Sequence, residues 1–286
     1  MPPPTRTASN LSITDQFYAR STAYTVPVSE NSPPPWLPLV IIGLIGGFFS
    51  GTFGVGGGLV MVPLLLWWTT FDQRRANATS LLAITPASLI GAISFSIGGV
   101  FEWFPAIFVA LGSVLGAQLG ARILSRIPLV PLKWVFISFI VVSSVGLFLE
   151  VPTRGGSLEV TAATAPVLLG LGLLMGVGAG MLGIGGGVIV TPAIMLFLGG
   201  SDVAAKSISL LAMAPGAFSG SILHIRHKNA LLRDGLWVAL GAVCAAPLGA
   251  YSAFALSPRL AAILFGLLTA SVAVSLIIRA IREGKN

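Results

Sequence analysis

Two short glycine clusters constrain this chain more than any other feature. The motif GVGGG at residues 54–58 interrupts one long apolar stretch, and GIGGG at residues 183–187 interrupts another, further along the chain. A proline follows each cluster at the same distance, at Pro63 and at Pro192. Glycine allows backbone conformations that a continuous helix does not use, so each cluster predicts a break. Breaks that recur inside membrane-length apolar sequence are typical of a transporter built from two halves.

The duplication extends well beyond the glycines. At the fixed offset that aligns Gly54 with Gly183, and without a gap, residues 43–66 match 172–195 at 9 of 24 positions. Further along, residues 76–91 match 205–220 at 7 of 16 positions. Apolar composition alone produces some identities, but it does not keep glycine and proline in one ungapped register. The sequence therefore predicts two homologous halves with the internal symmetry of many transporter folds.

Composition identifies the class of protein. The chain has 286 residues, of which 55% are hydrophobic and 9% are charged, and its mean hydropathy is +0.94. Soluble domains carry about 25% charged residues, so this chain lacks the polar side chains to cover a globule in water. The apolar stretches are long and alternate weakly, which favours membrane helices over a β-barrel. The net charge of +7 does not indicate a nucleic-acid partner, because the basic residues lie at segment ends, as membrane topology requires.

Few residues carry reactive chemistry, and this excludes several function classes. Cys244 is the single cysteine, and His224 and His227 are the two histidines, so we predict neither a metal site nor a cofactor. We predict no enzyme activity, because no HExxH motif, intramembrane aspartate pair or Ser/His pair is present. All nine acidic residues lie away from the middle of the apolar stretches. Proton and cation carriers usually bury an acid there, so this distribution favours an anionic or neutral substrate.

Two of the apolar stretches, 37–70 and 164–198, are too long for one membrane crossing of about 20 residues. Either each stretch is one tilted helix, or each folds back at its glycines into a helical hairpin. The positive-inside rule distinguishes the two arrangements. With single crossings the 16 Lys and Arg residues divide 9 to 7 between the two sides, whereas with hairpins they divide 13 to 3. The sequence therefore predicts hairpins and assigns both termini to the cytoplasm.

Each half then contains five membrane segments. Because five is odd, the second half enters the membrane from the opposite face, and the halves form inverted repeats. We predict an all-α polytopic membrane protein whose two glycine hairpins meet near the middle of the membrane. The expected parts are a disordered cytoplasmic tail (1–35), repeat 1 (36–150), a periplasmic linker (151–163), repeat 2 (164–281) and a cytoplasmic tail (282–286).

The hairpin tips are the predicted substrate site. Backbone groups at a tip inside a membrane are tolerated only within protein or beside a wet cavity. The half-helix after each cluster directs its free N–H groups and its positive dipole end into the tip, which makes an anion site. Ser50 and Thr191 are further hydroxyl donors near the tips. The predicted substrate-binding residues of the tips are Thr52, Gly54, Gly56, Gly57, Gly58, Gly183, Gly185, Gly186 and Gly187.

Other glycines, prolines and polar residues have more than one interpretation. Glycines spaced by four recur at 43/47/51, 172/176/180 and 112/116/120, and we expect these three series to pack helices closely. The prolines Pro63, Pro86, Pro192 and Pro215 are predicted gating or kink positions, and a kink that merely fits the packing is an equal alternative. Lys206 stands where the first half has Asn77. It could attract an anion, but we expect a lysine that extends to the membrane surface.

The duplicated pattern resembles a known family. The segments GGFFSGTFGVGGGLVMVP in one half and GVGAGMLGIGGGVIVTP in the other, with the related runs at 76–82 and 205–211, are similar to the TauE/SafE sulfite exporter family, also called the 4-toluene sulfonate uptake permease family. The resemblance covers about residues 37–281. It implies a bacterial inner-membrane carrier of sulfur-containing anions, such as sulfite or organosulfonates, with export commoner than uptake. Beside the glycines, the nearest matches to a substrate site are Thr79, Ser80, Ser207 and Ser209.

The leading hypothesis is a secondary transporter that exchanges small sulfur-containing anions by alternating access. The alternative is an anion channel, or a permease for another small organic anion, in which the hairpins line a continuous pore. The expected partners are the anionic substrate and the lipid bilayer, and whether the chain forms a homodimer is left open.

Overall fold

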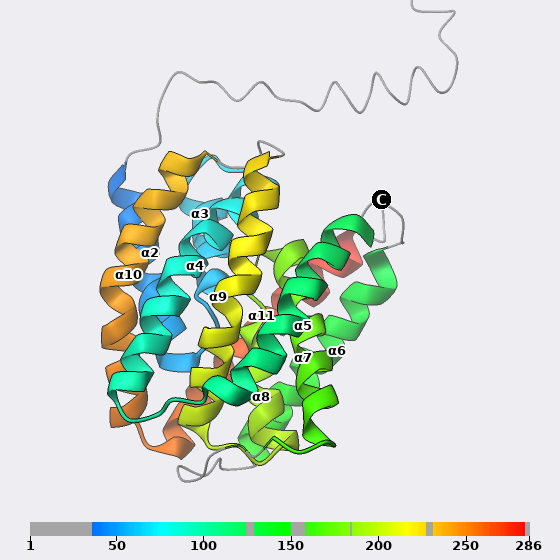
Figure 1. Cartoon of the computed structure of the whole chain (residues 1–286). Coiled ribbons are helices and arrows are strands. Elements are labelled where there is room, and N and C mark those ends of the chain that lie inside the picture. The colour runs from blue at the N-terminus through cyan, green and yellow to red at the C-terminus, as the bar shows by residue number, and fades with distance from the viewer. Residues whose placement is uncertain are drawn as a thin grey trace, which may run out of the picture. The chain divides into compact units, whose positions relative to one another are not determined.

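All regular structure in the described part of the chain is helical. The computed structural model describes residues 36–123, 129–149, 158, 160–183, 185–226 and 231–283. Pro35–Asn286 form one compact unit, and every regular element within the described residues is an α-helix (Figure 1). The predicted all-α fold class is therefore confirmed. The predicted tail at 1–35 and most of the predicted linker at 151–163 lie outside the described residues.

The helix boundaries show where the two long apolar stretches break. The helices are α2 (Trp36–Phe53), α3 (Gly58–Trp68), α4 (Gln73–Ile97), α5 (Trp103–Ile123), α6 (Leu129–Leu149), α7 (Thr164–Leu182), α8 (Gly187–Phe197), α9 (Asp202–Arg226), α10 (Leu232–Ala255) and α11 (Pro258–Glu283). One glycine cluster separates α2 from α3, and the other separates α7 from α8. Neither long stretch is one tilted helix, so that alternative is excluded.

Membrane-length helices are present, as the composition predicts. By length and composition, four helical stretches are long and apolar enough to cross a membrane: Trp36–Phe53, Gln73–Ile97, Leu232–Ala255 and Pro258–Ile278. The helices α3 and α8 after the glycine clusters have 11 residues each. At 1.5 Å per residue such a helix is about 16 Å long, roughly half of a hydrocarbon core of about 30 Å. Each of these two helices is therefore too short to span such a core by itself.

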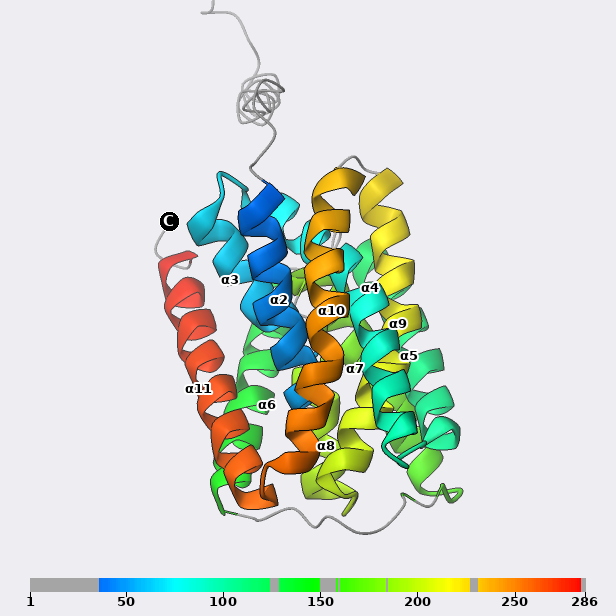
Figure 2. The same ribbon diagram turned by 90° about the vertical axis from the view of Figure 1, so that its left-hand side faces the viewer.

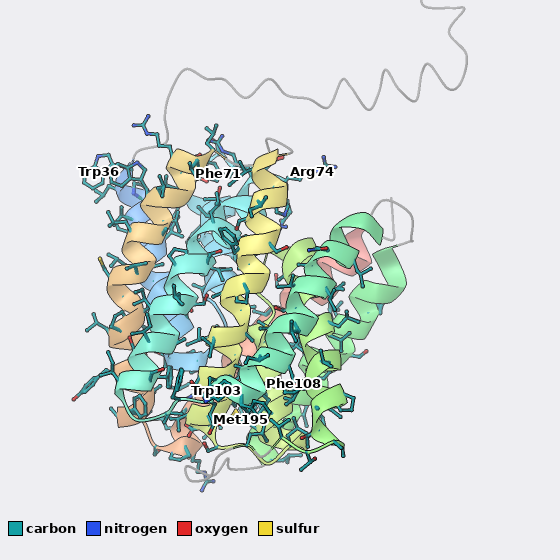
Figure 3. The ribbon with its side chains drawn as sticks, in the orientation of Figure 1. Trp36, Phe71, Arg74, Trp103, Phe108 and Met195 are labelled. Carbon is teal, nitrogen blue, oxygen red and sulfur yellow. The ribbon has the colours of Figure 1, made fainter. Side chains whose placement is uncertain are left out.

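The helices α2 and α3 form a hairpin that opens at one end of the helical unit. Trp36, at the start of α2, lies at the same end in Figure 3 as Phe71 and Arg74, which follow α3. Figure 2 shows α3 beside the upper part of α2, and the two helices are in contact. The chain therefore enters along α2, turns at the first glycine cluster and returns along α3.

The helices α7 and α8 form a second hairpin that opens at the other end. Helix α7 runs parallel to α5, because Gly112 packs on Leu169 and Gly116 packs on Leu173. Met195 of α8 lies in Figure 3 at the same end as Trp103, where α5 begins. Since α7 begins at that end and α8 returns to it, the two hairpins enter the unit from opposite ends.

Most glycines of the four-residue series pack helices closely, as predicted, but a Cβ atom at Gly180 would make only an ordinary contact, 3.5 Å from the Ala117 oxygen, and the surroundings of Gly120 lie outside the described residues. A Cβ atom at Gly43 or Gly47 of α2 would overlap the carbonyl oxygen of Val238 or Ala242 in α10. Helices α5 and α7 pack in the same way, since a Cβ atom at Gly112 would overlap the carbonyl oxygen of Leu169. Only a residue without a side chain allows two backbones to approach this closely.

Contacts in one half recur in the other half at equivalent positions, numbered by the offset that aligns Gly54 with Gly183. Gly43 packs on the Val238 carbonyl, and the equivalent Gly172 packs on the Val109 carbonyl. The helices α6 and α11 occupy equivalent positions in the two halves and pack on each other, with Ser144 Oγ 2.8 Å from Thr269 Oγ1. At the centre, α4 packs on its equivalent α9. Each half therefore contributes helices to the packing of the other.

Candidate substrate site at the two glycine loops

The glycine clusters form two tight loops with left-handed backbone conformations. We call residues 54–57 the first glycine loop and residues 183–186 the second glycine loop. The φ angles of Gly54, Gly56 and Gly57 are 70°, 80° and 71°, and those of Gly183, Gly185 and Gly186 are 65°, 88° and 70°. Side chains other than glycine adopt such φ values rarely and at a cost. This requirement explains why three glycines are needed in each loop.

The two loops meet each other inside the protein. Thr191 Oγ1 of α8 donates a hydrogen bond of 3.3 Å to the carbonyl oxygen of Gly54. A Cβ atom at Gly187 would lie 2.5 Å from that same oxygen, and one at Gly185 would lie 3.2 Å from the Val55 oxygen. Gly58 and Gly187 are the first residues of α3 and α8, so the N-terminal ends of both short helices adjoin the meeting point. Helix N-termini carry partial positive charge, which favours an anion, although the N–H groups of Gly58, Val60 and Ile189 already donate to backbone oxygens of their own loops.

Two equivalent serines hold the loops. Ser209 Oγ of α9 donates a hydrogen bond of 2.7 Å to the Gly54 oxygen. Ser80 Oγ of α4 lies 2.8 Å from the Gly183 oxygen and 2.9 Å from the Asn77 oxygen, and its single proton serves one of them at a time. A buried carbonyl without a donor is unstable, so these serines stabilise the loop of the opposite half. The structure thus brings the predicted residues Ser80 and Ser209 to the glycine loops.

Sequence reasoning missed two apolar side chains that pack against the glycine loops. Ile84 and Met213 occupy equivalent positions, each four residues after its loop-binding serine. A Cβ atom at Gly185 would lie 3.0 Å from Met213 Sδ and 3.3 Å from Ile84 Cδ1, and one at Gly56 would overlap Met213 Sδ. Residues four apart lie on one helix face, so Ile84 shares a face with Ser80, and Met213 shares a face with Ser209. This spacing is the sequence pattern that could have identified the two apolar residues.

Two buried hydroxyls near the loops have no hydrogen-bond partner among the described residues. Thr79 Oγ1 lies on α4 beside Ser80, and Ser50 Oγ lies on the last turn of α2. Both side chains are fully buried. An unsatisfied buried hydroxyl costs about 1–3 kcal/mol, so a substrate oxygen that accepted from either group would recover that free energy.

Two predicted hydroxyls point to other partners. Thr52 Oγ1 donates to the Phe48 oxygen at 2.9 Å and lies 2.8 Å from Ser252 Oγ, which joins α2 to α10. Ser207 Oγ donates at 3.2 Å to the oxygen of Val100, in the connection between α4 and α5. The structure therefore does not bring these two hydroxyls to the glycine loops.

The four predicted prolines all lie inside helices. Pro63 and Pro192 are the sixth residues of the short helices α3 and α8, and Pro86 and Pro215 lie in the central helices α4 and α9. A proline inside a helix leaves one carbonyl without its usual donor and favours a bend. Their role in gating stays a prediction.

The prediction that Lys206 extends to the membrane surface is wrong. The Lys206 side chain is 1% exposed, and its Nζ lies 3.4 Å from Oδ2 of Asp202, which is also 1% exposed. Asp202 was not recognised from the sequence, although it stands four residues before Lys206 and therefore on the same helix face. In the first half the equivalent residues form a neutral pair, in which Gln73 Nε2 donates to Asn77 Oδ1 at 2.8 Å.

Charged groups also lie at the two ends of the helical unit. Arg75 Nη2 of α4 lies 2.6 Å from Asp234 Oδ2 of α10, and the Arg75 guanidinium lies 4.0 Å from the centre of the Phe71 ring. At the other end, burial raises the pKa of Glu102 above its ordinary value, and a hydrogen bond from the Leu158 backbone N–H offsets part of that rise. No group of three His, Cys, Asp or Glu side chains that could hold a metal ion occurs in the part of the chain that the structure describes.

Comparison with known proteins finds relatives that are named as probable membrane transporter proteins. The probable membrane transporter protein YunE of Bacillus subtilis is 37% identical over 84 residues, which are 29% of this chain and 31% of that protein. The probable membrane transporter protein YdhB of the same species is 28% identical over 106 residues, 37% of this chain and 43% of that protein. The probable membrane transporter protein y4hK of Sinorhizobium fredii is 36% identical over 97 residues, 32% of this chain and 39% of that protein. The chain thus spans less than half the length of each of these three relatives.

The family described as Sulfite exporter TauE/SafE matches far more of the chain. The match covers residues 11–147 and 168–286, so it includes both glycine loops and the serines that hold them. Because this match covers most of the chain, the chain belongs to the TauE/SafE sulfite exporter family.

Proposed function

We propose that this protein is a secondary transporter of small sulfur-containing anions, such as sulfite or organosulfonates, across the bacterial inner membrane. Export is the proposed direction, and alternating access between the two halves is the proposed mechanism. The family's description supports the substrate class. The relatives' names support membrane transport without naming a substrate.

The observation that carries the proposal is the meeting of the two glycine loops. The N-termini of α3 and α8 adjoin that point, where their dipoles favour a negative charge. The surroundings are otherwise mostly apolar, with Val55, Ile84, Val188 and Met213 all buried. Partial positive charges in an apolar enclosure attract an anion more strongly than they would in water, because the local dielectric constant is low.

The proposal includes inverted repeats with both termini in the cytoplasm. The recurrence of equivalent contacts in the two halves supports a two-fold relation between them. The opposite directions of the two hairpins support its inversion (Figure 3). The 13 to 3 distribution of Lys and Arg supports the orientation. In such a fold, rocking of one half against the other exposes a central site to each side in turn.

Counterflow in vesicles tests the proposal. Proteoliposomes loaded with a high concentration of sulfite are diluted into medium that contains a trace of radiolabelled sulfite. A carrier exchanges the two pools, so we expect the label to accumulate transiently inside above its external concentration. Sulfoacetate and methanesulfonate are expected to support the same exchange, whereas vesicles without protein give none.

Two results would contradict the proposal in different ways. Counterflow with acetate or another carboxylate, and none with sulfite or any sulfonate, would mean that the protein is a carrier of a different anion. Anion flux that shows conductance but no counterflow would mean that the loops line a channel.

A further inference from the structure

Met213 of α9 contacts both glycine loops. A Cβ atom at Gly56 of the first loop would overlap Met213 Sδ, and one at Gly185 of the second loop would lie 3.0 Å from the same sulfur. Ile84, at the equivalent position of α4, lies slightly further away, with distances of 3.4 Å to a Cβ at Gly56 and 3.3 Å to one at Gly185. Both side chains are buried. Of this equivalent pair, Met213 therefore makes the closer contacts, and it makes them to both loops.

The end of the Met213 side chain lies against the N-terminus of α8. A Cβ atom at Gly187, the first residue of that helix, would lie 2.6 Å from Met213 Cε. The same atom would lie 2.5 Å from the Gly54 oxygen and 2.8 Å from Ser209 Oγ. The oxygen and the hydroxyl are hydrogen-bonded to each other, whereas the methyl group of a methionine forms no hydrogen bond. Of these three neighbours, Met213 is therefore the one that can move aside without the loss of a hydrogen bond.

The two equivalent residues also differ in flexibility. Methionine is unbranched and adapts its shape to irregular gaps, whereas isoleucine is branched at Cβ and has a restricted χ1 angle. Met213 and Ile84 belong to the same buried apolar cluster as Val55 and Val188. Rotation of Met213 away from Gly187 therefore opens apolar space beside the α8 N-terminus, while Ile84 keeps its place.

An organosulfonate has two parts that suit these surroundings. Its sulfonate group carries the negative charge that the positive end of a helix dipole favours. Its organic substituent gains free energy when it leaves water for apolar surroundings. Because Met213 Cε lies beside Gly187, a substituent bound next to the α8 N-terminus must occupy the space that Met213 leaves. Sulfite has no organic substituent and needs the least of this space.

We propose that Met213 sets the upper size limit for the organic substituent of the transported anion. The inference rests on the proposed function, because it assigns a specificity-determining residue to that same substrate site. Protein interiors are closely packed, so the movement of one side chain admits a small group such as the methyl of methanesulfonate and excludes the ring of benzenesulfonate. The proposal also makes the site asymmetric, with a movable residue on α9 and a stiff one on α4.

Variants of the full-length protein with a shorter side chain at position 213 test the assignment. Titration calorimetry measures the binding of sodium sulfite, methanesulfonate and benzenesulfonate to the protein in detergent. We expect M213A to raise the affinity for benzenesulfonate, relative to that for methanesulfonate, about 10- to 200-fold, the range for a change of one methylene in an apolar pocket. The affinity for sulfite is expected to stay close to that of the wild type, because sulfite does not use the space that the variant adds.

Two further variants keep the test decisive if M213A does not fold. M213V removes less volume than M213A, and we expect it to shift the preference in the same direction by a smaller factor. M213L conserves the volume of the side chain and is expected to keep the wild-type preference for methanesulfonate over benzenesulfonate.

The matched control is M195A. Met195 is also buried, but it lies eight residues after Gly187 on α8, about 12 Å along the helix. The control therefore makes the same chemical change away from the loops. We expect it to keep the wild-type preference even where it lowers stability.

Several outcomes would overturn the inference while a sulfur-anion carrier stands. One is a wild type that binds benzenesulfonate as tightly as methanesulfonate. Another is an unchanged preference in both M213A and M213V. A third is a shift in M195A as large as that in M213A, because general loosening of the core would then explain the result.

Carboxylates separate the inference from the proposed function. If the wild type binds acetate but no sulfite or sulfonate, and M213A gains affinity for benzoate relative to acetate, Met213 sets the size limit and the proposed substrate is wrong. No binding of any anion by the wild type would overturn both.

Discussion

At the scale of single residues, the two serines that hold the glycine loops are not equally important. The Gly54 oxygen accepts from Ser209 and also from Thr191. Thr191 is equivalent to Val62 in the first half, and valine has no hydroxyl to offer the Gly183 oxygen. We therefore expect S80A to lower the free energy of unfolding by about 1–3 kcal/mol, the cost of an unsatisfied buried acceptor, and S209A to lower it by less. Denaturant unfolding in detergent micelles measures both.

The matched control for this pair is S94A. Ser94 Oγ donates to the Ile90 oxygen within its own helix, so its removal leaves no loop without a donor. We expect S94A to change stability by less than either loop variant. If S80A were no more destabilising than S94A, the serine would not be holding the second glycine loop.

Glu102 is a single residue that makes the stability of the folded protein depend on pH. Burial raises its pKa in the folded protein above the ordinary value of 4.5, so the folded state binds the proton more tightly than the unfolded state does. The contribution of Glu102 to stability is then greatest below pH 4.5 and decreases as the pH rises through the raised pKa. We expect E102Q to flatten this part of the stability profile, measured as apparent melting temperature against pH. An unchanged profile would mean that burial of Glu102 does not affect its proton affinity.

At this scale the sequence predicted the breaks at the glycines better than the environment of the polar side chains, since Thr52 and Ser207 bond elsewhere and Lys206 is buried. The glycine loops were predictable because the clusters recur at a fixed offset and because glycine has a conformational signature, whereas Ser80 and Ser209 were named from the family resemblance. The burial of Lys206 was not found, because the lysine lies near the start of an apolar stretch, where most lysines extend to the surface. The packing of the first glycine loop on α9 contributes to its burial, and no local sequence pattern predicts that contact.

At the scale of helices, stability depends on backbone contact at the glycine series. In G47A the new methyl group would overlap the Ala242 oxygen and lie 2.5 Å from the Ala242 Cα, so α2 and α10 must separate. Overpacking of this kind costs about 1–3 kcal/mol. Gly170 of α7 has no neighbour within 4 Å of an added Cβ. We therefore expect G170A to leave the stability of the protein unchanged or to raise it, because alanine has a higher helix propensity than glycine. Opposite shifts in apparent melting temperature would support the packing role, and equal shifts would contradict it.

The helices and their breaks were largely predictable from the sequence. The positive-inside count favoured two hairpins over two long helices, and the structure ends α2 at Phe53 and begins α3 at Gly58, on either side of the glycines. Which helices pack together was not predictable, because each glycine series identifies a close-packing face without identifying its partner. The pairing of α2 with α10 and of α5 with α7 joins helices from different halves.

At the scale of the whole membrane unit, the hairpins determine which loops lie on the same side. Thr70 follows the first hairpin, at the end where Phe71 and Arg74 lie (Figure 3). Ser257 joins α10 to α11 at the opposite end (Figure 2). Both side chains belong to described residues that are exposed. If the hairpin topology and the charge distribution are both right, a cysteine at position 70 lies in the cytoplasm and one at position 257 lies outside.

Labelling with a membrane-impermeant maleimide in intact cells checks this arrangement. The background is C244A, because the native cysteine is exposed. We expect S257C to label in intact cells and T70C to label only after the membrane is made permeable. Labelling of both positions from the same side would contradict the hairpin, because α2 and α3 would then cross as one segment. Labelling of T70C alone in intact cells would agree with the hairpin but would show that the protein has the opposite orientation in the membrane. Most of the basic residues would then not face the cytoplasm.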